Sequence, residues 1–445
     1  MRQARRTFLW RSTLAMASAG VPRFLANRSL DPDPFILSQR GCGRATGYAE
    51  ANKIISANNK THVAWLDSLN DGFSVRVRSF DHQTSTWSPL VVIGDGHDNH
   101  GGPSLTIDGE GFLHIVYFPH HHAMRYRRST RPFDASEWTT ETYFGERLTY
   151  PTLVCGPDDT LYCSCRRSYI DQPWEVELWK KTREGDWQFV SRVLRSRHHG
   201  YAHFQESLCW SKVDHSLHLA CRVHEKSDEK AYGRLQAVAY LQSSDFGRSW
   251  KSLDGNTVQA TATVDDLSPL VLGGLDMGKI LRCGQMGVNR KGDPFLVYSQ
   301  EIEGFGETFL AKPKVEGGWN QILLNTFLPA NYKGWSMIMP GGLVFDQDDQ
   351  LYIVAQIHQA GQEQSWGHPS NEIVVLKSRD HGTTFESTLI SRQDIATSHW
   401  LPSIERPTGH NHFIGGPTIA FTSGKPGAGN SDILSNEVCV VMNGI

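Results

Sequence analysis

The stretch Leu113–Phe118, LHIVYF, decides the fold, because close variants of it recur along the chain. Each copy is short and rich in Val, Ile, Leu and aromatic residues. Most copies follow a turn of Gly, Asp and Asn, and this combination is typical of a β-strand. Successive copies lie 48 to 86 residues apart. The copies are THVAWLD (61–67), LHIVYF (113–118), LYCSCR (161–166), LHLACR (217–222), PFLVYS (294–299), LYIVAQ (351–356) and EVCVVM (437–442).

A second repeated segment comes 12 to 15 residues before most of these strands. Its copies are HGGPSLTID (100–108), YPTLVCGPD (150–158), HFQESLCW (203–210), CGQMGVNR (283–290) and PGGLVFDQ (340–347), with GGPTIAFTS (415–423) near the end of the chain. Strands that recur in pairs, about 50 residues or more apart, are typical of four-stranded propeller blades. The sequence therefore predicts one all-β domain over residues 35–445, a seven-bladed β-propeller of four-stranded antiparallel blades. A pair of β-sandwiches is the alternative, but it would not explain the repeated strand pairs.

Two hairpins carry the same turn motif, SSDFGRSW (243–250) and SRDHGTTF (378–385). In this Asp-box pattern the Asp caps backbone groups, the Gly supplies a positive φ and the aromatic ring packs beneath the turn. The motif is structural, so it supports a hairpin-rich fold and says nothing directly about a reaction.

The first 26 residues are predicted to be an export signal that takes no part in the fold. They contain five Arg and no acid, and RRTFL (5–9) resembles a twin-arginine signal. A merely basic, frayed terminus is the alternative. Removal of the segment, by cleavage near Ala19 or Ala26, would change the net charge from −3 to about −8 and leave an acidic protein in the periplasm or outside the cell.

The rest of the composition argues against several classes of protein. No apolar run of 18 residues is present, so no transmembrane helix is expected. The chain has no basic tail and no nucleic-acid-binding module, which argues against a nucleic-acid partner. The eight cysteines include no C-x-x-C pair, so a redox or zinc-ribbon site is not indicated. We expect a monomer.

Five histidines fall within residues 98–129, and the repeats separate their roles. His114 occupies a position that holds His, Tyr or Phe in most other copies of the strand, which indicates packing. The run PHHH (119–122) also suggests a metal site. Adjacent residues on an extended chain point to opposite faces, so at most His120 and His122 could share such a site.

Four other positions are expected to meet on one rim of the propeller. His100 and Tyr150 open the first repeated strand in adjacent blades, while His120 and Arg166 follow the ends of the paired strands. Because neighbouring strands are antiparallel, the start of one lies beside the end of the next. The sequence thus predicts that two imidazoles, a phenol and a guanidinium converge.

These side chains suit proton abstraction next to a carboxylate. An ordinary glycosidase needs two carboxylates, and Asp98 is the only acid within two residues of the four positions. Arg166 would neutralise a substrate carboxylate as charge develops, a neutral His would take the carbon-bound proton, and Tyr150 would protonate the departing oxygen. That reaction is β-elimination, the chemistry of lyases that act on uronic acids.

The stretches DNHGGPSLTIDGEGFLHIVYFPHHHAMRYRRS (98–129) and TYPTLVCGPDDTLYCSCRRS (149–168), together with the Asp boxes, resemble the BNR-repeat propeller family that includes ulvan lyases. The nearest pattern is that of polysaccharide lyase family 25, and the likeness covers essentially the whole predicted propeller. It implies cleavage of a sulfated algal polysaccharide between rhamnose 3-sulfate and a uronic acid. His100 would be the base, Tyr150 the acid (or the base for the opposite epimer), Arg166 the carboxylate neutraliser, and His120 a second histidine that positions substrate.

The resemblance also implies an anionic polysaccharide as partner, and hence further groups along its path. Asn99, Arg167, Arg222 and His224 are candidates by position. No catalytic cofactor is expected, although such propellers can carry a structural divalent ion, zinc or calcium. The metal ligands stay unknown at this stage. The possible soft ligands are His203, Cys209, Cys221, His224 and Cys283.

Two other functions remain open on sequence alone. Asp boxes are common in sialidases, so a sialidase-like or other glycoside hydrolase is the second hypothesis. The early Arg-Ile-Pro signature of sialidases is missing, however. A non-catalytic carbohydrate-binding propeller is the third.

Overall fold

The computed structural model describes residues 34–226, 233–361, 367–392, 396–425 and 435–442. Within this part of the chain there are 32 β-strands and four short 3-10 helices, and the strands form five antiparallel sheets. Backbone contacts group Pro32–Ile445 into one compact unit. The predicted export signal, residues 1–26, lies outside the described residues. Among the described helices, none has the length and apolar character needed to cross a bilayer.

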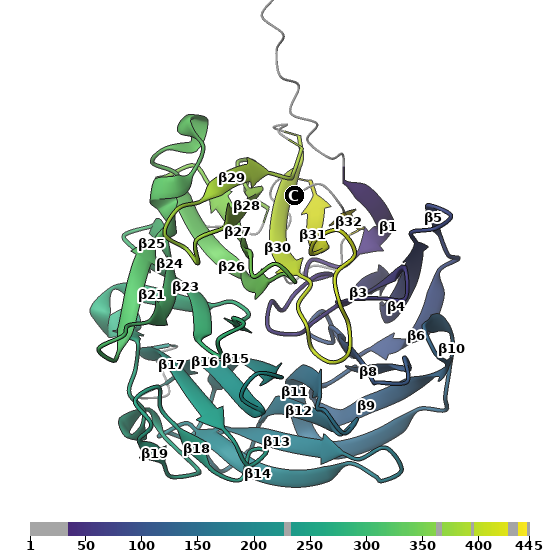
Figure 1. The fold of residues 1–445 in the computed structure, drawn as a ribbon, viewed down its shortest axis with the longest axis horizontal. Coiled ribbons are helices and arrows are strands. Elements are labelled where there is room, and N and C mark those ends of the chain that lie inside the picture. The colour runs from purple at the N-terminus through teal and green to yellow at the C-terminus, as the bar shows by residue number, and fades with distance from the viewer. Residues whose placement is uncertain (1–33, 227–232, 362–366, 393–395, 426–434, 443–445) are drawn as a thin grey trace, which may run out of the picture. The chain divides into compact units, whose positions relative to one another are not determined.

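The largest sheet joins strands from both ends of this unit. Its main strand order is β30-β31-β32-β1-β3-β4-β5, with β2 paired to β3 and β6 paired to β4. β1 pairs with β32 over Phe35↔Val440 to Gly41↔Asn436, so strands about 400 residues apart lie side by side (Figure 1). The strands are β1 (Phe35–Gly41), β2 (Ile54–Ala57), β3 (Lys60–Leu69), β4 (Gly72–Asp81), β5 (Thr86–Trp87), β6 (Val91–Gly96), β30 (Ser398–Ile404), β31 (Ile419–Gly424) and β32 (Asn436–Val441).

The second sheet has eight strands and carries the predicted catalytic positions. Pairing between β9 and β11, from Thr142↔Tyr126 to Thr149↔His120, unites two groups of strands that the sequence assigned to separate blades. This pairing places His120 next to the start of the segment that carries Tyr150. The strands are β7 (Ser104–Ile107), β8 (Leu113–Tyr117), β9 (His120–Arg131), β10 (Asp134–Trp138), β11 (Thr142–Cys155), β12 (Leu161–Arg167), β13 (Glu175–Lys181) and β14 (Gln188–Arg195).

Three smaller sheets follow in chain order. The first contains β15 (Ala202–Ser211), β16 (Ser216–Glu225), β17 (Leu235–Ser243), β18 (Trp250–Lys251), β19 (Thr257–Val258) and β20 (Val271–Gly273). The second contains β21 (Lys279–Cys283), β22 (Gly287–Val288), β23 (Pro294–Ile302), β24 (Phe305–Pro313) and β25 (Trp319–Leu323). The third contains β26 (Ser336–Phe345), β27 (Leu351–His358), β28 (Glu372–Ser378) and β29 (Glu386–Leu389). The 3-10 helices are η1 (Val264–Asp266), η2 (Leu275–Met277), η3 (Leu324–Phe327) and η4 (Ala330–Tyr332).

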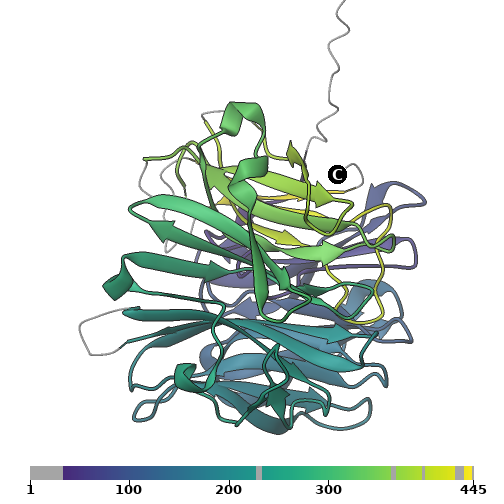
Figure 2. The ribbon, with the colours of Figure 1, turned by 60° about the vertical axis from the view of Figure 1, so that its left-hand side comes forward.

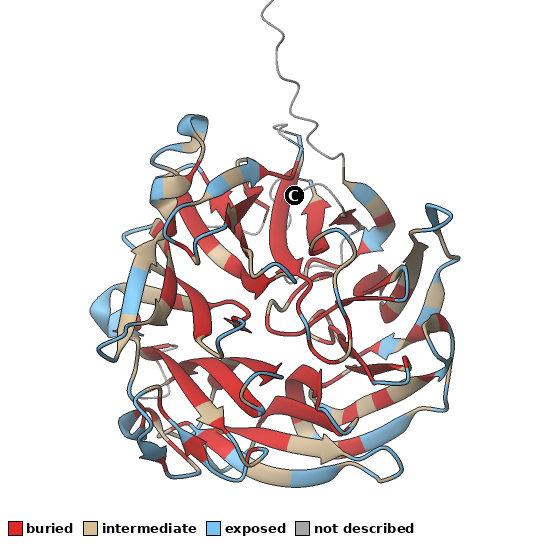
Figure 3. Ribbon diagram, viewed as in Figure 1, coloured by how far each residue is buried: buried red, intermediate tan, exposed pale blue. Residues whose placement is uncertain are grey.

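Neighbouring sheets of this unit pack against one another through their faces (Figure 2). The inner strands are the most buried, and β16 and β27 are buried along their whole length, whereas the outer β25 is partly or fully exposed (Figure 3). The fold is therefore all-β and propeller-like.

Six of the seven copies of the repeated strand lie at the same place in their sheets, directly after the inner strand, in β3, β8, β12, β16, β23 and β27. The prediction is wrong for the last pair: GGPTIAFTS (415–423) falls on β31 and EVCVVM (437–442) on β32, each one strand further out, because β30 is the inner strand there. The second residue of every copy is at most 6% exposed. His114 is held by Tyr126, whose hydroxyl lies 2.8 Å from Nδ1, and by Asp108, 3.0 Å from Nε2. His218 makes the same two kinds of contact, with Tyr240 and Asp214. His114 is thus a buried structural histidine.

Both Asp boxes form the expected turn. In the first, the Asp245 carboxylate accepts hydrogen bonds from the backbone N–H of Arg248 and Ser249 at 3.1 and 2.8 Å. Gly247 has a φ of +86°, and the Trp250 ring is buried beneath the turn. The Asp380 carboxylate caps its own turn in the same way.

Gly247→Ala is expected to lower the free energy of unfolding by about 1–3 kcal/mol for two reasons. Alanine is strained at the positive φ of this position, and its Cβ would lie 2.1 Å from Cδ2 of Leu178. Urea unfolding of Gly255→Ala is the matched control. Gly255 has a φ of +79° with no atom within 4 Å, so only backbone strain is added there. Equal losses for the two variants would contradict a steric role for Gly247.

Candidate active site

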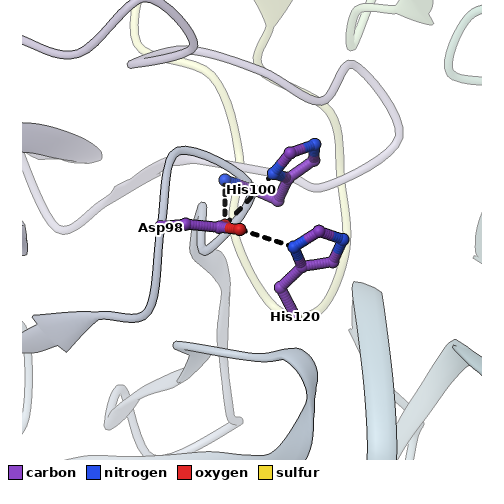
Figure 4. Close-up of side chains that lie close together, drawn as sticks. All are labelled: Asp98, His100 and His120. Carbon is purple, nitrogen blue, oxygen red and sulfur yellow. Dashed lines mark hydrogen bonds and ion pairs between the residues drawn. The ribbon is translucent and has the colours of Figure 1, made fainter. Parts of the chain in front are cut away.

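Two of the predicted histidines share one carboxylate (Figure 4). Asp98 lies in the loop after β6, and its Oδ1 is 3.1 Å from Nδ1 of His100 while its Oδ2 is 2.5 Å from Nδ1 of His120. The backbone N–H of His100 also donates to Asp98 Oδ1 at 2.8 Å. The two rings are stacked, with centroids 4.1 Å apart. Because both Nδ1 atoms face the carboxylate, Nδ1 carries the proton whenever either ring is neutral, and Nε2 of that ring carries the lone pair.

The electrostatics favour a neutral His100. The pKa of His100 is lowered to about 4, chiefly by burial and also by the nearby charge of Arg44, against the raising effect of the hydrogen bond to Asp98. Burial works against ionisation of Asp98, but the hydrogen bonds from His100 and His120 outweigh it, so the pKa of Asp98 lies well below its usual range. At neutral pH the site therefore contains an ionised Asp98 and an unprotonated His100 that can accept a proton.

Tyr150 lies next to this pair because the backbone turns sharply there. Tyr150 has a φ of +58°, and the register of β11 against β12 shifts between Thr149 and Thr152. Its ring centroid is 6.3 Å from that of His100 and 4.6 Å from that of Tyr48. Burial, with a counteracting effect from Arg166, raises the pKa of Tyr150 to about 12. The phenol is thus protonated at neutral pH and can serve as an acid.

Arg166 completes the predicted group from beneath the Tyr150 ring. Its guanidinium carbon lies 4.5 Å from the centroid of that ring and 4.7 Å from the centroid of Trp174. The side chain is buried, and Nη1 donates to the carbonyl of Ala202 at 3.4 Å. Within the described part of the chain, Nε and Nη2 of Arg166 have no hydrogen-bond partner. A buried guanidinium with two free donors is suited to an anionic ligand.

A cleft of about 530 Å³ opens beside His100 and Tyr150. Among the described residues, its lining includes three arginines and no Asp or Glu, a set that favours anions. Tyr48, Tyr150 and Tyr201 supply flat apolar surface of the kind that sugars contact. The other lining residues are Arg44, His100, His203, Gln205, Arg222, His224, Gly233, Gln236, Leu275, Ile280, Arg282 and Met339.

The four predicted substrate-binding residues are placed differently from one another. Arg222 and His224 line the cleft. Arg222 Nη2 lies 2.6 Å from Nδ1 of His203, and Gln236 Nε2 donates to His224 Nδ1 at 2.9 Å. Asn99 is buried beside His100 and lies outside the lining.

Arg167 lies apart from the cleft. Successive residues of β12 point to opposite faces, so Arg167 points away from Arg166. Its Nη1 is 3.0 Å from a Glu177 carboxylate oxygen, and its guanidinium lies over the Tyr169 ring.

The repeat pattern missed several residues of the site. Arg44 and Tyr48, which contact each other, come from the loop between β1 and β2, where no repeated strand lies. Tyr201 directly precedes β15, one of the repeated strands, so extending the alignment of that strand to the preceding residues would have found it. Arg282 lies on β21, which with β22 forms the interrupted inner strand of its sheet, and it directly precedes the repeat copy that begins at Cys283.

The residues that the sequence suggested as metal ligands do not form a cluster of three in the described part of the chain. Within the described residues, no three of His203, Cys209, Cys221, His224 and Cys283 bring ligand atoms within 4.8 Å of one another. Two other sets do so, namely Asp98, His100 and His120, and Cys155, Asp159 and His410. In the first set the Nδ1 atoms already face the carboxylate as hydrogen-bond partners.

Relatives of known name match parts of this chain. It is 26% identical over 203 residues to a family 25 ulvan lyase from Pseudoalteromonas sp. (strain PLSV), a match that covers 40% of each protein. It is 23% identical over 199 residues to an ulvan lyase from Nonlabens ulvanivorans, covering 39% of this chain and 41% of that protein. The chain thus matches only about two fifths of the length of these curated relatives.

Solved structures match nearly the whole chain in fold. A family 25 ulvan lyase bound to -GlcA(1-4)Rha3S- superposes with a TM-score of 0.68 at 15% identity, covering 92% of this chain and 96% of that one. The polysaccharide lyase Uly1 superposes with a TM-score of 0.60 at 13% identity, covering 93% and 99%. The likeness to ulvan lyases that the sequence predicted is confirmed. The model of the BNR repeat-containing family matches residues 60–326, more than half of the sequence, and the chain therefore belongs to that family.

Proposed function

We propose that this protein is a polysaccharide lyase that cleaves an ulvan-type, sulfated, uronate-containing polysaccharide by β-elimination. The observation that carries this proposal is a neutral imidazole and a protonated phenol in a cleft whose described lining has three arginines and no carboxylate, with the buried guanidinium of Arg166 directly beneath the phenol ring. The sequence relatives named ulvan lyases, and the ulvan lyase structure bound to -GlcA(1-4)Rha3S-, support the same substrate class.

Each group has a defined part in the reaction. His100 Nε2 takes the proton from the carbon next to the uronate carboxylate, and the electron pair left behind forms the C4=C5 double bond. The bond from C4 to the glycosidic oxygen breaks, and Tyr150 gives its proton to that oxygen. The free donors of Arg166 stabilise the carboxylate as negative charge spreads onto it. His100 lines the cleft and His120 does not, which supports His100 as the base and His120 as its positioning partner through Asp98.

The number of blades is a further part of this proposal. We infer seven blades, because the two largest sheets each divide into two groups of strands. The nine-stranded sheet divides where a single residue pair, Gly41↔Asp67, joins β1 to β3, and the eight-stranded sheet divides between β9 and β11. Export by a twin-arginine signal, a monomeric state and the lack of a catalytic cofactor stay predictions.

The direct test is to incubate the purified protein with ulvan and follow near-ultraviolet absorbance. β-Elimination creates an alkene conjugated to a carboxylate, whereas hydrolysis creates none. We expect absorbance to rise with the native protein and not with His100→Ala. The matched control is His215→Asn, an exposed histidine with a φ of +53° at the opposite end of β15, where Asn tolerates the backbone conformation. New reducing ends without absorbance would replace the lyase with a hydrolase, and binding without either product would make the protein a carbohydrate-binding propeller.

The pH dependence of the reaction should reveal the depressed pKa of His100. Protonation removes the base, so kcat/KM should fall only as pH approaches about 4, the value to which burial lowers this pKa. At and above pH 6.5, the usual value for histidine, the base is fully unprotonated in the free enzyme. Initial rates measured from pH 4 to pH 8 check this. An acid limb centred near pH 6.5 would contradict the assignment of His100 as the base.

A further inference from the structure

The loop between β30 and β31 crosses the end of the fold that lies opposite the cleft. It is anchored by backbone contacts to two of the inner strands. Thr408 O accepts a hydrogen bond from Cys155 N at 2.6 Å, and His410 N donates to Ile107 O at 3.2 Å. Gly409 fits so closely that a Cβ there would lie 2.3 Å from Ile107 O. These contacts hold the His410 side chain beside the turn that follows β11.

Three side chains of different chemistry meet at this place. A thiol sulfur of Cys155, a carboxylate oxygen of Asp159 and a ring nitrogen of His410 all lie within 4.8 Å of one another. Cys155 is 1% exposed, whereas the Asp159 and His410 side chains are 20% and 32% exposed. A small ion could therefore enter from the solvent side and reach a buried sulfur.

The spacing of these atoms matches a tetrahedral ion better than a direct ion pair. His410 Nε2 lies 3.3 Å from Asp159 Oδ1. A charge-assisted hydrogen bond between such groups is about 2.7–2.9 Å long. Ligand atoms about 2.0–2.2 Å from a tetrahedral Zn²⁺ are separated from each other by about 3.3–3.5 Å.

The surroundings also suit a cation. Asp159 Oδ1 accepts the backbone N–H of Gly109 at 2.7 Å, which fixes the orientation of the carboxylate in the way that outer-shell partners fix metal ligands.

We propose that Cys155, Asp159 and His410 bind one Zn²⁺, with water as the fourth ligand. Thiolate, imidazole and carboxylate are the three ligand types that zinc accepts together, while calcium prefers oxygen alone. Cys155 lies five residues along β11 from Tyr150, roughly 15 Å at the rise of a strand, so the ion would not touch the reacting sugar. It would fasten the β30–β31 loop to the β11 turn. This inference is independent of the proposed reaction.

Metal analysis of the folded full-length protein tests the proposal. After equilibration with Zn²⁺ and removal of the excess, we expect one zinc per chain in the native protein and none in His410→Ala or Asp159→Asn. His412→Ala is the matched control, because His412 is an exposed histidine two residues further along the same loop. Zinc should also raise the melting temperature of the native protein and of the control, and leave that of His410→Ala unchanged.

Cobalt substitution reports on the sulfur ligand directly. Co²⁺ bound to a thiolate absorbs in the near ultraviolet through charge transfer, and this band should be present in the native protein and absent from Cys155→Ala. If Cys155→Ala does not fold, the zinc content of His410→Ala and Asp159→Asn decides whether the site exists. A native protein that retains no zinc, or a His410→Ala variant that retains one zinc per chain, would overturn the proposal.

Discussion

Tyr150→Phe should lower kcat on ulvan by about 10²- to 10⁴-fold, since removing a general acid from a proton transfer typically costs that much. The variant loses one oxygen and keeps the ring that packs against Tyr48 and Arg166, so the fold and KM should change little. Burial keeps the Tyr150 proton in place by raising its pKa to about 12, so the loss should be seen across the neutral pH range. Initial rates from near-ultraviolet absorbance, beside the melting temperature, measure both effects.

The control for this prediction is Tyr143→Phe. Tyr143 is 61% exposed, lies on the same strand β11 and contacts Glu141 outside the cleft. It should retain full activity. A Tyr150→Phe variant with kcat near that of the native protein would mean that another group protonates the leaving oxygen, and Tyr201 in the same cleft would be the next residue to test.

Arg406→Ala is expected to lower the free energy of unfolding by about 3–5 kcal/mol. Arg406 lies in the β30–β31 loop and is 2% exposed. Its guanidinium donates to Ser207 Oγ and Leu208 O, both at 2.9 Å, and to Glu50 O at 2.8 Å. Substitution leaves these buried acceptors without their donor and opens a cavity as well. Urea unfolding followed by fluorescence measures the loss.

Arg131→Ala provides the comparison for a surface arginine. Its ion pair with Asp134, 3.0 Å long, is solvent-exposed, and such pairs contribute about 0–1 kcal/mol. If Arg406→Ala destabilised the protein no more than Arg131→Ala does, the loop would not be anchored by its buried guanidinium.

The parts of the fold that repeat could be predicted, because a repeat leaves the same pattern of burial at each copy. The paired strands around His114 and His218 are examples, and even their hydrogen-bond partners match. The union of β9 with β11 was not predictable in this way. It depends on the exact length of the turn before β11 and on a register shift near Leu148, which no apolar pattern encodes.

In the candidate site, too, the residues that could be predicted are those that lie next to repeated strands. His100, His120, Tyr150 and Arg166 were found because they flank repeated strands. Asp98 was noted only as a nearby acid, although it is the group that orients both imidazoles.

Arg167 and Tyr48 show why the rest of the site could not be predicted. Position alone could not tell Arg167 from Arg166, because the alternation of a strand sends one toward Tyr150 and the other toward Glu177. Tyr48 enters the cleft from a loop that contains no repeated strand, so no alignment of repeats points to it, and its place is fixed by side-chain contacts such as the hydrogen bond from Lys53 Nζ to its carbonyl.

The pairing of β1 with β32 has a consequence for the order in which the protein can form. The strand that begins the described fold has no partner from its own end of the chain along most of its length, since it meets β3 at only one residue pair. Its edge stays open while the ribosome makes the intervening residues, and it is covered only when Asn436–Val441 has emerged. Closing so long a segment carries a large entropic cost, and contacts between residues far apart in sequence slow folding. We therefore expect completion of the domain to be a late, post-translational event, and a chain stalled before residue 436 to expose a strand edge to which chaperones or other nascent chains can bind.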